Sequence, residues 1–160
     1  MYLQERIVRA LKTHSLRVAV AESLTGGLLM AAFTDVPGAS AVFQGGIVAY
    51  QTSLKHRLLG VDEHVLNTQG AVCADTAEQM ALGVRERLAE GALVSTLGLS
   101  TTGVAGPDWQ DDQPPGTVFI GLATQSGVHS FEHAFSGGRQ EIREATVQAA
   151  LEHLRDYLHL

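Results

Sequence analysis

The stretch LRVAVAESLTGGLLMAAF, residues 16–33, decides the fold of this chain. Its first part, Leu16–Ala21, is mostly apolar and rich in Val, which predicts a buried strand. Leu28–Phe33 is a second apolar run, and we interpret it as a helix. The turn between them, Glu22–Gly27, contains Ser, Thr and Gly, which are typical turn residues. A strand that passes directly into a helix is the unit from which α/β domains are built.

Helical and extended patterns alternate on both sides of this unit. Apolar residues at helical spacing predict a helix at the N-terminus. They predict another from about Asp75, where Glu78 completes a capping-box-like start and Gly91 marks the end. The other expected elements are a strand at 46–50, short helices at 54–59 and 63–66, strands at 93–100, 117–124 and 128–135, and a last helix from about 139.

This order of elements predicts a single three-layer α/β/α domain over residues 1–160, in the α/β fold class. Helices that alternate with strands favour parallel pairing, whereas the hairpin turn at 124–128 favours antiparallel pairing. We therefore expect a mixed, mainly parallel sheet that contains an antiparallel member.

The composition excludes several classes of protein. Lys and Arg total 11 against 17 Asp and Glu, so the formal net charge of −6 disfavours a nucleic-acid binder. The single cysteine, Cys73, excludes an intramolecular disulfide and any multi-cysteine metal site. No apolar stretch is long enough to span a membrane, and the charged N-terminus does not resemble a secretory signal. A cytoplasmic protein is the expectation.

The basic residues are unevenly divided, because only Lys12 and Lys55 are lysine and the rest are arginine. A lysine can be held neutral in a protein, whereas an arginine cannot. Codon usage alone explains such a bias equally well. Against an arginine background, however, a lysine at position 55 is a candidate for a role that requires loss of a proton.

Three polar, glycine-containing segments follow predicted strands: AESLTGG (21–27), TTGVAGP (101–107) and FSGGR (135–139). In open α/β sheets, ligands bind where strands end and loops lead into helices. Taken singly, each segment is also an ordinary turn or cap sequence. The generic hydrolase, P-loop and zinc motifs are missing, and the seven histidines are scattered, so no metal site is expected.

These segments resemble the CinA C-terminal domain family, the bacterial nicotinamide-nucleotide amidases of the PncC type. The resemblance also rests on the Gly46–Lys55 segment, LGV (59–61), GAV (70–72) and PPGTV (114–118), and it covers residues 5–157. It implies hydrolysis of nicotinamide mononucleotide to nicotinate mononucleotide and ammonia, by a serine nucleophile and a lysine base, without metal or cofactor. A stand-alone homodimeric amidase that binds neither nucleic acid nor membrane is expected.

Carried over by motif position, the resemblance implies that Ser23 is the nucleophile, Lys55 the base and Tyr50 an associated catalytic hydroxyl. The positions that it assigns to substrate binding or to the surroundings of the site are Glu22, Thr25, Gly26, Gly27, Gly46, Thr102, Gly103 and Arg139.

The residue chemistry is consistent with these roles. A serine hydroxyl is inert until a base removes its proton, and a lysine can do so only if its pKa falls from about 10.4 towards neutrality. N–H groups of the turn 25–27 are candidate donors to the oxyanion, and Arg139 suits a phosphate. Tyr50 is a candidate to relay a proton or to orient Lys55. The alternatives are a solvated Lys55, an edge-strand Tyr50, a Thr102 that only pins its loop, and an Arg139 that pairs with Glu141 or Glu144.

The chain departs from the family pattern at Leu24 and Cys73, where cysteine and serine are common, and in the loop 108–113. This loop is usually glycine-rich, but here it reads DWQDDQ. Acidic residues and an indole in a loop beside the site would alter its preference for an anionic nucleotide. The resemblance also implies an alternative function, because the family is associated with competence: a non-catalytic nucleotide-binding or partner-binding module. The altered loop 108–113 is its only support in the sequence.

Overall fold

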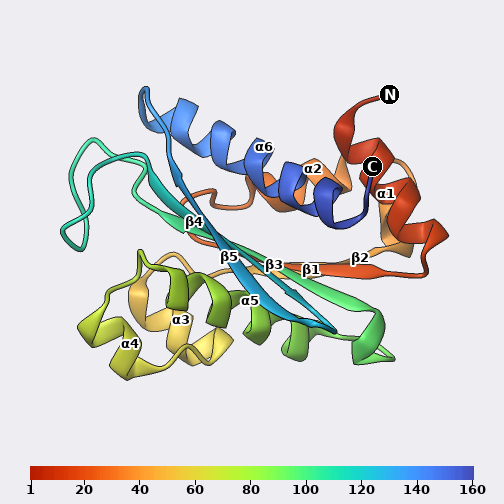
Figure 1. Cartoon of the computed structure of the whole chain (residues 1–160), viewed down its shortest axis with the longest axis horizontal. Helices are drawn as coiled ribbons and strands as arrows, with labels where there is room; N and C mark the ends of the chain where they lie inside the picture. The colour runs from red at the N-terminus through yellow and green to blue at the C-terminus, as the bar shows by residue number, and fades with distance from the viewer.

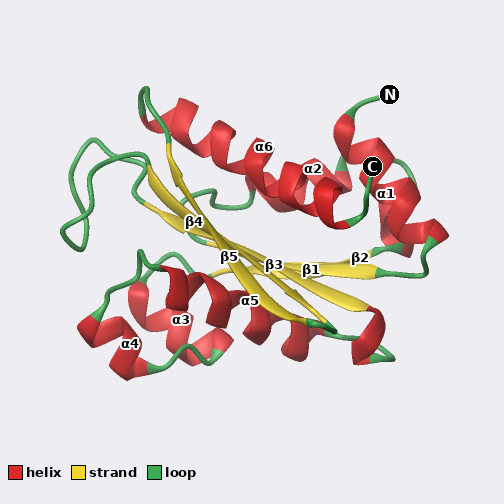
Figure 2. Cartoon of the chain, in the orientation of Figure 1, coloured by secondary structure: helices red, strands yellow, loops and turns green.

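A computed structural model describes residues 1–160 as one five-stranded sheet with helices on both faces (Figure 1). The strands are β1 (Arg17–Glu22), β2 (Phe43–Val48), β3 (Thr96–Gly103), β4 (Thr117–Thr124) and β5 (Gly127–Ala134). The helices are α1 (Leu3–Thr13), α2 (Leu28–Thr34), α3 (Thr52–Leu59), α4 (Glu63–Thr68), α5 (Ala74–Leu88) and α6 (Arg139–Tyr157). Helices α1, α2 and α6 cover one face of the sheet, and α3, α4 and α5 cover the other (Figure 2). The predicted three-layer α/β/α architecture is confirmed.

The sheet has the strand order β2-β1-β3-β4-β5. β1 pairs in parallel with both β2 and β3, whereas β4 pairs antiparallel with both β3 and β5. All strands except β4 therefore run in the same direction, as expected for a mainly parallel sheet with an antiparallel member. None of the helices is long and apolar enough to cross a membrane.

Strand β1 lies inside the sheet and is buried on both faces, which explains its nearly continuous apolar sequence. Because side chains alternate along a strand, Val18 and Val20 belong to the larger core cluster, with residues of α1, α2 and α6. Ala19 and Ala21 belong to a smaller cluster on the opposite face, with residues of α3 and α5.

Several element boundaries differ from those predicted by one to three residues, and the starts of β2, β3 and α5 have a structural explanation. β2 begins at Phe43 rather than at residue 46, because parallel pairing with β1 supplies a main-chain ladder through Gly45 and Gly46. β3 begins at Thr96, since residues 93–95 form a turn of 3₁₀ helix. α5 begins one residue before Asp75, and the sulfur of Cys73 caps it by accepting the Thr76 N–H.

The ends of the strands bring the three glycine-containing segments to one edge of the sheet. Glu22 is paired with Val48 of β2 on one side and with Thr101 of β3 on the other. The residues that follow β1 therefore lie beside the β2–α3 connection and the loop after β3. This edge is where the fold positions a site.

Candidate active site

Ser23 and Lys55 meet at the carboxyl end of β1. Ser23 is the first residue after the strand, and its main-chain N–H donates to Thr101 O at 3.0 Å. Lys55 lies in α3, and its Nζ is 2.9 Å from Ser23 Oγ, to which it donates a hydrogen bond. Ser23 is only 7% exposed and Lys55 only 1% exposed. The structure therefore brings together the predicted nucleophile and base, and Lys55 is not a solvated surface charge.

The burial of Lys55 shifts its protonation equilibrium towards the neutral form. Desolvation by burial lowers the pKa of Lys55 from 10.5 to about 8, and the carboxylate of Asp111 opposes that shift. The amine also donates to Ala49 O at 2.8 Å and to Tyr50 O at 3.3 Å, so main-chain carbonyls orient it. At pH 7 about a tenth of such lysines are unprotonated, a proportion suited to a general base.

The turn that carries Ser23 is held by side chains rather than open to a ligand. The fully buried carboxylate of Glu22 accepts N–H bonds from Gly27, Leu29 and Met30, at 3.0, 3.1 and 2.7 Å, and so caps α2. Thr25 is also fully buried, and its hydroxyl lies 2.8 Å from that of Thr101. Glu22 and Thr25 thus use their side-chain oxygens within the protein, and the substrate-binding roles predicted for them stay predictions.

Two of the three turn N–H groups that were predicted as oxyanion donors are used within the protein. Gly26 N–H donates to Ser23 O, and Gly27 N–H donates to Glu22, so neither is free for an oxyanion. The positive φ angles of these two residues, 57° and 107°, explain why the turn needs glycine there. The amides of Leu24 and Thr25 make no hydrogen bond within the protein, and Leu24 lines the cavity described next. The main-chain N–H of Leu24 is therefore the candidate hydrogen-bond donor to an oxyanion.

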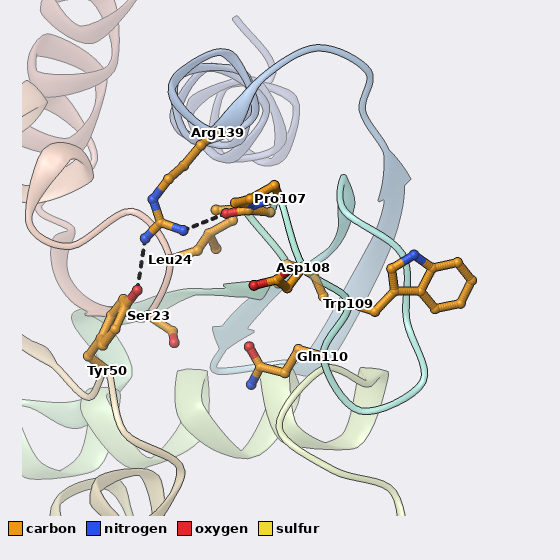
Figure 3. Close-up of a pocket in the computed structure, with 12 residues that line it drawn as sticks. Ser23, Leu24, Tyr50, Pro107, Asp108, Trp109, Gln110 and Arg139 are labelled. Carbon is orange, nitrogen blue, oxygen red and sulfur yellow. Dashed lines mark hydrogen bonds between the residues drawn. The ribbon is translucent and has the colours of Figure 1, made fainter.

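A cavity of about 380 Å³ opens above Ser23, within the size range of small-molecule sites. Figure 3 shows Asp108 and Gln110 on one side of it and Tyr50 on the other, with Arg139 near Pro107. The residues that line it are Ser23, Leu24, Tyr50, Gly103, Val104, Ala105, Gly106, Pro107, Asp108, Trp109, Gln110 and Arg139.

Tyr50 and Arg139 form the rim of the cavity together. Arg139 donates to the Tyr50 hydroxyl at 2.9 Å and to Gly106 O at 2.8 Å (Figure 3). The Tyr50 hydroxyl thus faces Arg139, whereas Lys55 contacts only the Tyr50 carbonyl. The hydroxyl makes no hydrogen bond to Lys55 here, and its predicted relay or orienting role stays a prediction. Arg139 pairs with neither Glu141 nor Glu144.

Two other predicted substrate-binding residues, Gly46 and Thr102, make contacts within the fold and do not line the cavity. A Cβ at Gly46 would lie 2.3 Å from Met30 Sδ, so the glycine permits close packing of α2 on β2. Thr102 is 1% exposed and donates to Ala71 O at 2.6 Å, which matches the alternative in which it pins a loop. Gly103, in contrast, does line the cavity. No group of three or more His, Cys, Asp or Glu side chains is placed to hold a metal ion.

The sequence reasoning missed two residues that support the site. Arg143 donates to Leu24 O at 2.9 Å and to Thr25 O at 3.2 Å, and so holds the nucleophile turn from α6. Its position four residues after Arg139, on the same helical face, was a usable signal. Asp111 accepts the Ala71 N–H at 2.8 Å across the loop that departs from the family pattern. No local pattern indicated this contact, because the two residues are distant in sequence.

Fold and site together define a three-layer α/β/α domain with a buried serine–lysine pair beneath a cavity at the strand ends. The family model for the CinA C-terminal domain matches residues 1–158. This chain belongs to the CinA C-terminal domain family.

Relatives and solved structures agree with this assignment. A CinA-like protein from Frankia casuarinae is 49% identical over 98% of this chain, and a competence-damage inducible protein from Halothermothrix orenii is 42% identical over 98%. The chain spans only 35% and 37% of their lengths. The competence/damage inducible protein CihA from Agrobacterium tumefaciens superposes with a TM-score of 0.89 at 38% identity, covering 99% of this chain and 94% of that one. A CinA superfamily protein from Klebsiella pneumoniae gives 0.91 at 26% identity, covering 98% and 96%.

Proposed function

We propose that this protein is a nicotinamide-nucleotide amidase that hydrolyses nicotinamide mononucleotide to nicotinate mononucleotide and ammonia. The observation that carries the proposal is the 2.9 Å contact between Ser23 Oγ and Lys55 Nζ beneath the cavity. Burial of the amine, with a pKa of about 8, supplies a base that removes the serine proton near neutral pH.

The first half of the reaction transfers the acyl group to the enzyme. Neutral Lys55 takes the proton of Ser23 Oγ as this oxygen attacks the carboxamide carbon, and the carbonyl oxygen becomes an oxyanion. The N–H of Leu24, unpartnered within the protein, is our candidate donor to this oxyanion. When the C–N bond breaks, the Lys55 ammonium gives its proton to the leaving nitrogen. Ammonia departs and a Ser23 ester remains.

The second half repeats these steps with water. Lys55, neutral again, takes a proton from a water molecule, which attacks the ester carbon. Collapse of the second tetrahedral intermediate breaks the bond to Ser23 Oγ, and Lys55 returns the proton to that oxygen. Nicotinate mononucleotide leaves, and the enzyme regains its starting state. No metal takes part in this scheme.

The charges at the rim suit a substrate that carries both signs. Nicotinamide mononucleotide has a cationic pyridinium ring next to the reacting amide and an anionic phosphate at its other end. The carboxylate of Asp108 points into the cavity near Ser23, where it complements the ring (Figure 3). Arg139 is exposed at the rim and has the planar guanidinium geometry that grips a phosphate with two N–H groups.

Incubation with nicotinamide mononucleotide, with detection of ammonia and of the nucleotide product, tests the proposal. We expect turnover by the wild-type protein and loss of at least about 10³-fold in Ser23→Ala. Undiminished turnover by Ser23→Ala would contradict a mechanism with Ser23 as the nucleophile. Tight binding of the nucleotide by wild type without hydrolysis would instead favour the non-catalytic binding module.

A further inference from the structure

The loop between β3 and β4 forms one wall of the cavity, and its far end is a tight turn. Gln110 and Gln113 exchange main-chain hydrogen bonds, at 3.1 and 2.8 Å, so that Asp111 and Asp112 are the two central residues. Both have positive φ, 50° and 59°, as a type I′ turn requires. Non-glycine residues adopt this conformation at a cost, although Asp tolerates it better than most.

The side chain of Asp111 attaches this turn to the opposite side of the site. Its Oδ2 accepts the Ala71 N–H at 2.8 Å, and its carboxylate packs so closely that a Cβ on Gly70 would lie 2.8 Å from it. The anchoring segment is itself fixed, because Thr102 donates to Ala71 O and Thr76 donates to Gly70 O. The turn at the end of the loop is therefore tied to a segment that is itself hydrogen-bonded to β3 and α5.

The residues between the anchor and β3 are those that face the substrate cavity. Arg139 holds the near end of the loop by donating to Gly106 O. Asp111 holds the far end, directly after the cavity-lining residues 106–110, but does not itself line the cavity. We propose that Asp111 is a positioning residue for substrate binding: its hydrogen bond to Ala71 fixes the wall formed by residues 108–110 beside Ser23.

The charge of Asp111 gives the same residue a second, separable effect. Its carboxylate raises the pKa of Lys55, whereas desolvation lowers it. Asp111 is the charged group that contributes to the pKa of Lys55. Removing the negative charge therefore lowers the pKa of Lys55 and moves the rise of activity with pH to lower pH. Merely structural damage to the loop would not produce that displacement.

Kinetics of three variants separate the effect of the hydrogen bond from Ala71 to Asp111 from the effect of the Asp111 charge. This part of the test rests on the proposed amidase function. Asp111→Ala removes both, so KM for nicotinamide mononucleotide should rise about tenfold, with kcat within about threefold of wild type. Asp111→Asn retains an oxygen that accepts the Ala71 N–H, so KM should stay within about threefold while the pH profile still shifts downwards. Asp112→Asn, the adjacent exposed carboxylate, is the matched control and should change neither.

Hydrogen exchange of the 160-residue chain without substrate tests the anchor independently of activity. The Ala71 amide should exchange at least about tenfold faster in Asp111→Ala than in wild type, and Asp111→Asn should restore most of the protection. Unchanged exchange and unchanged KM in Asp111→Ala would overturn the proposal. If wild type fails to hydrolyse the nucleotide but the exchange pattern is as expected, the amidase function fails and the anchor stands.

Discussion

Two regions of the site are built in opposite ways. We call the buried pair beneath the cavity, Ser23 and Lys55, the floor. The rim consists of Tyr50, Arg139 and residues 108–110. The floor side chains are 7% and 1% exposed, whereas Tyr50 is 55% exposed. Burial lowers the pKa of Lys55, which a base requires, but a rim that captures a charged nucleotide must be reachable from water. On the proposed amidase function, the buried pair sets reactivity and the exposed rim sets substrate preference.

Removal of the Lys55 amine should produce the largest effect, a loss of deamidation. Lys55→Met keeps an unbranched side chain of similar length but has no amine, so deamidation should fall by at least about 10³-fold. Ammonia release under saturating nucleotide measures it. Lys12→Met, which removes the other lysine from an exposed position in α1, should leave turnover intact. Comparable rates in Lys55→Met and wild type would contradict the dyad.

Loss of the rim cation should affect binding rather than chemistry. Arg139→Ala removes a charged hydrogen-bond donor from the cavity, so KM should rise about 10- to 100-fold while kcat changes little. Steady-state kinetics distinguish the two parameters. Arg155→Ala, near the opposite end of the same helix, provides the control, since Arg155 pairs only with Asp156 at the surface. A pure kcat defect in Arg139→Ala would place Arg139 in the chemistry instead.

The buried amine of Lys55 should also lower the free energy of unfolding. The pKa of Lys55 is about 8 in the folded protein and 10.5 when unshifted, so the unfolded chain binds the proton more tightly. Folding stability therefore rises with pH between 8 and 10.5, and below pH 8 the protonated amine is a net penalty. Lys55→Met should stabilise the protein at pH 7 by on the order of 1–3 kcal/mol.

Urea unfolding at pH 7 and at pH 10 measures this difference, with Lys12→Met as the baseline. The stabilisation by Lys55→Met should shrink at pH 10, where the buried amine of the wild type is neutral. A variant that is equally destabilised at both pH values would show that the amine contributes stabilising contacts rather than a desolvation penalty. A cooperative unfolding transition of Lys55→Met at pH 7 would also show that its expected loss of activity does not result from loss of folding.

The smallest effect on kinetics and stability is expected from substitution of Trp109, the largest side chain of the rim. Trp109 is 66% exposed, and its indole points away from the cavity (Figure 3). Trp109→Ala should therefore leave KM and kcat within about threefold of wild type, and unfolding free energy within about 0.5 kcal/mol. A large rise in KM would mean that the indole folds over the bound nucleotide.

Local pattern predicted most of the fold because the pattern and the packing agree. β4 was predicted with the bounds that it has, since both of its ends are marked by turn residues. The start of β2 was missed because its glycines carry no apolar signal and only pairing with β1 defines it. The three-layer arrangement followed from the order of elements alone.

The site was predictable where a motif position and its chemistry coincide, as for Ser23 and Lys55. The supporting contacts join residues far apart in the chain: Arg139 reaches Tyr50 across 89 positions, and Arg143 reaches Leu24 across 119. No local pattern contains such pairings. For the same reason, the sequence did not indicate that the polar side-chain atoms of Glu22 and Thr102 form hydrogen bonds within the fold.

A direct titration of Lys55 tests the central claim most sharply. The chain has only two lysines, so protein labelled with ¹³C-lysine gives two Cε signals by NMR, and Lys12→Arg assigns the one from Lys55. The buried floor predicts that the Lys55 signal titrates with a midpoint of about pH 8. A midpoint near the ordinary lysine value of about 10.4 would contradict the account, because Lys55 would then be fully charged at neutral pH and unable to activate Ser23.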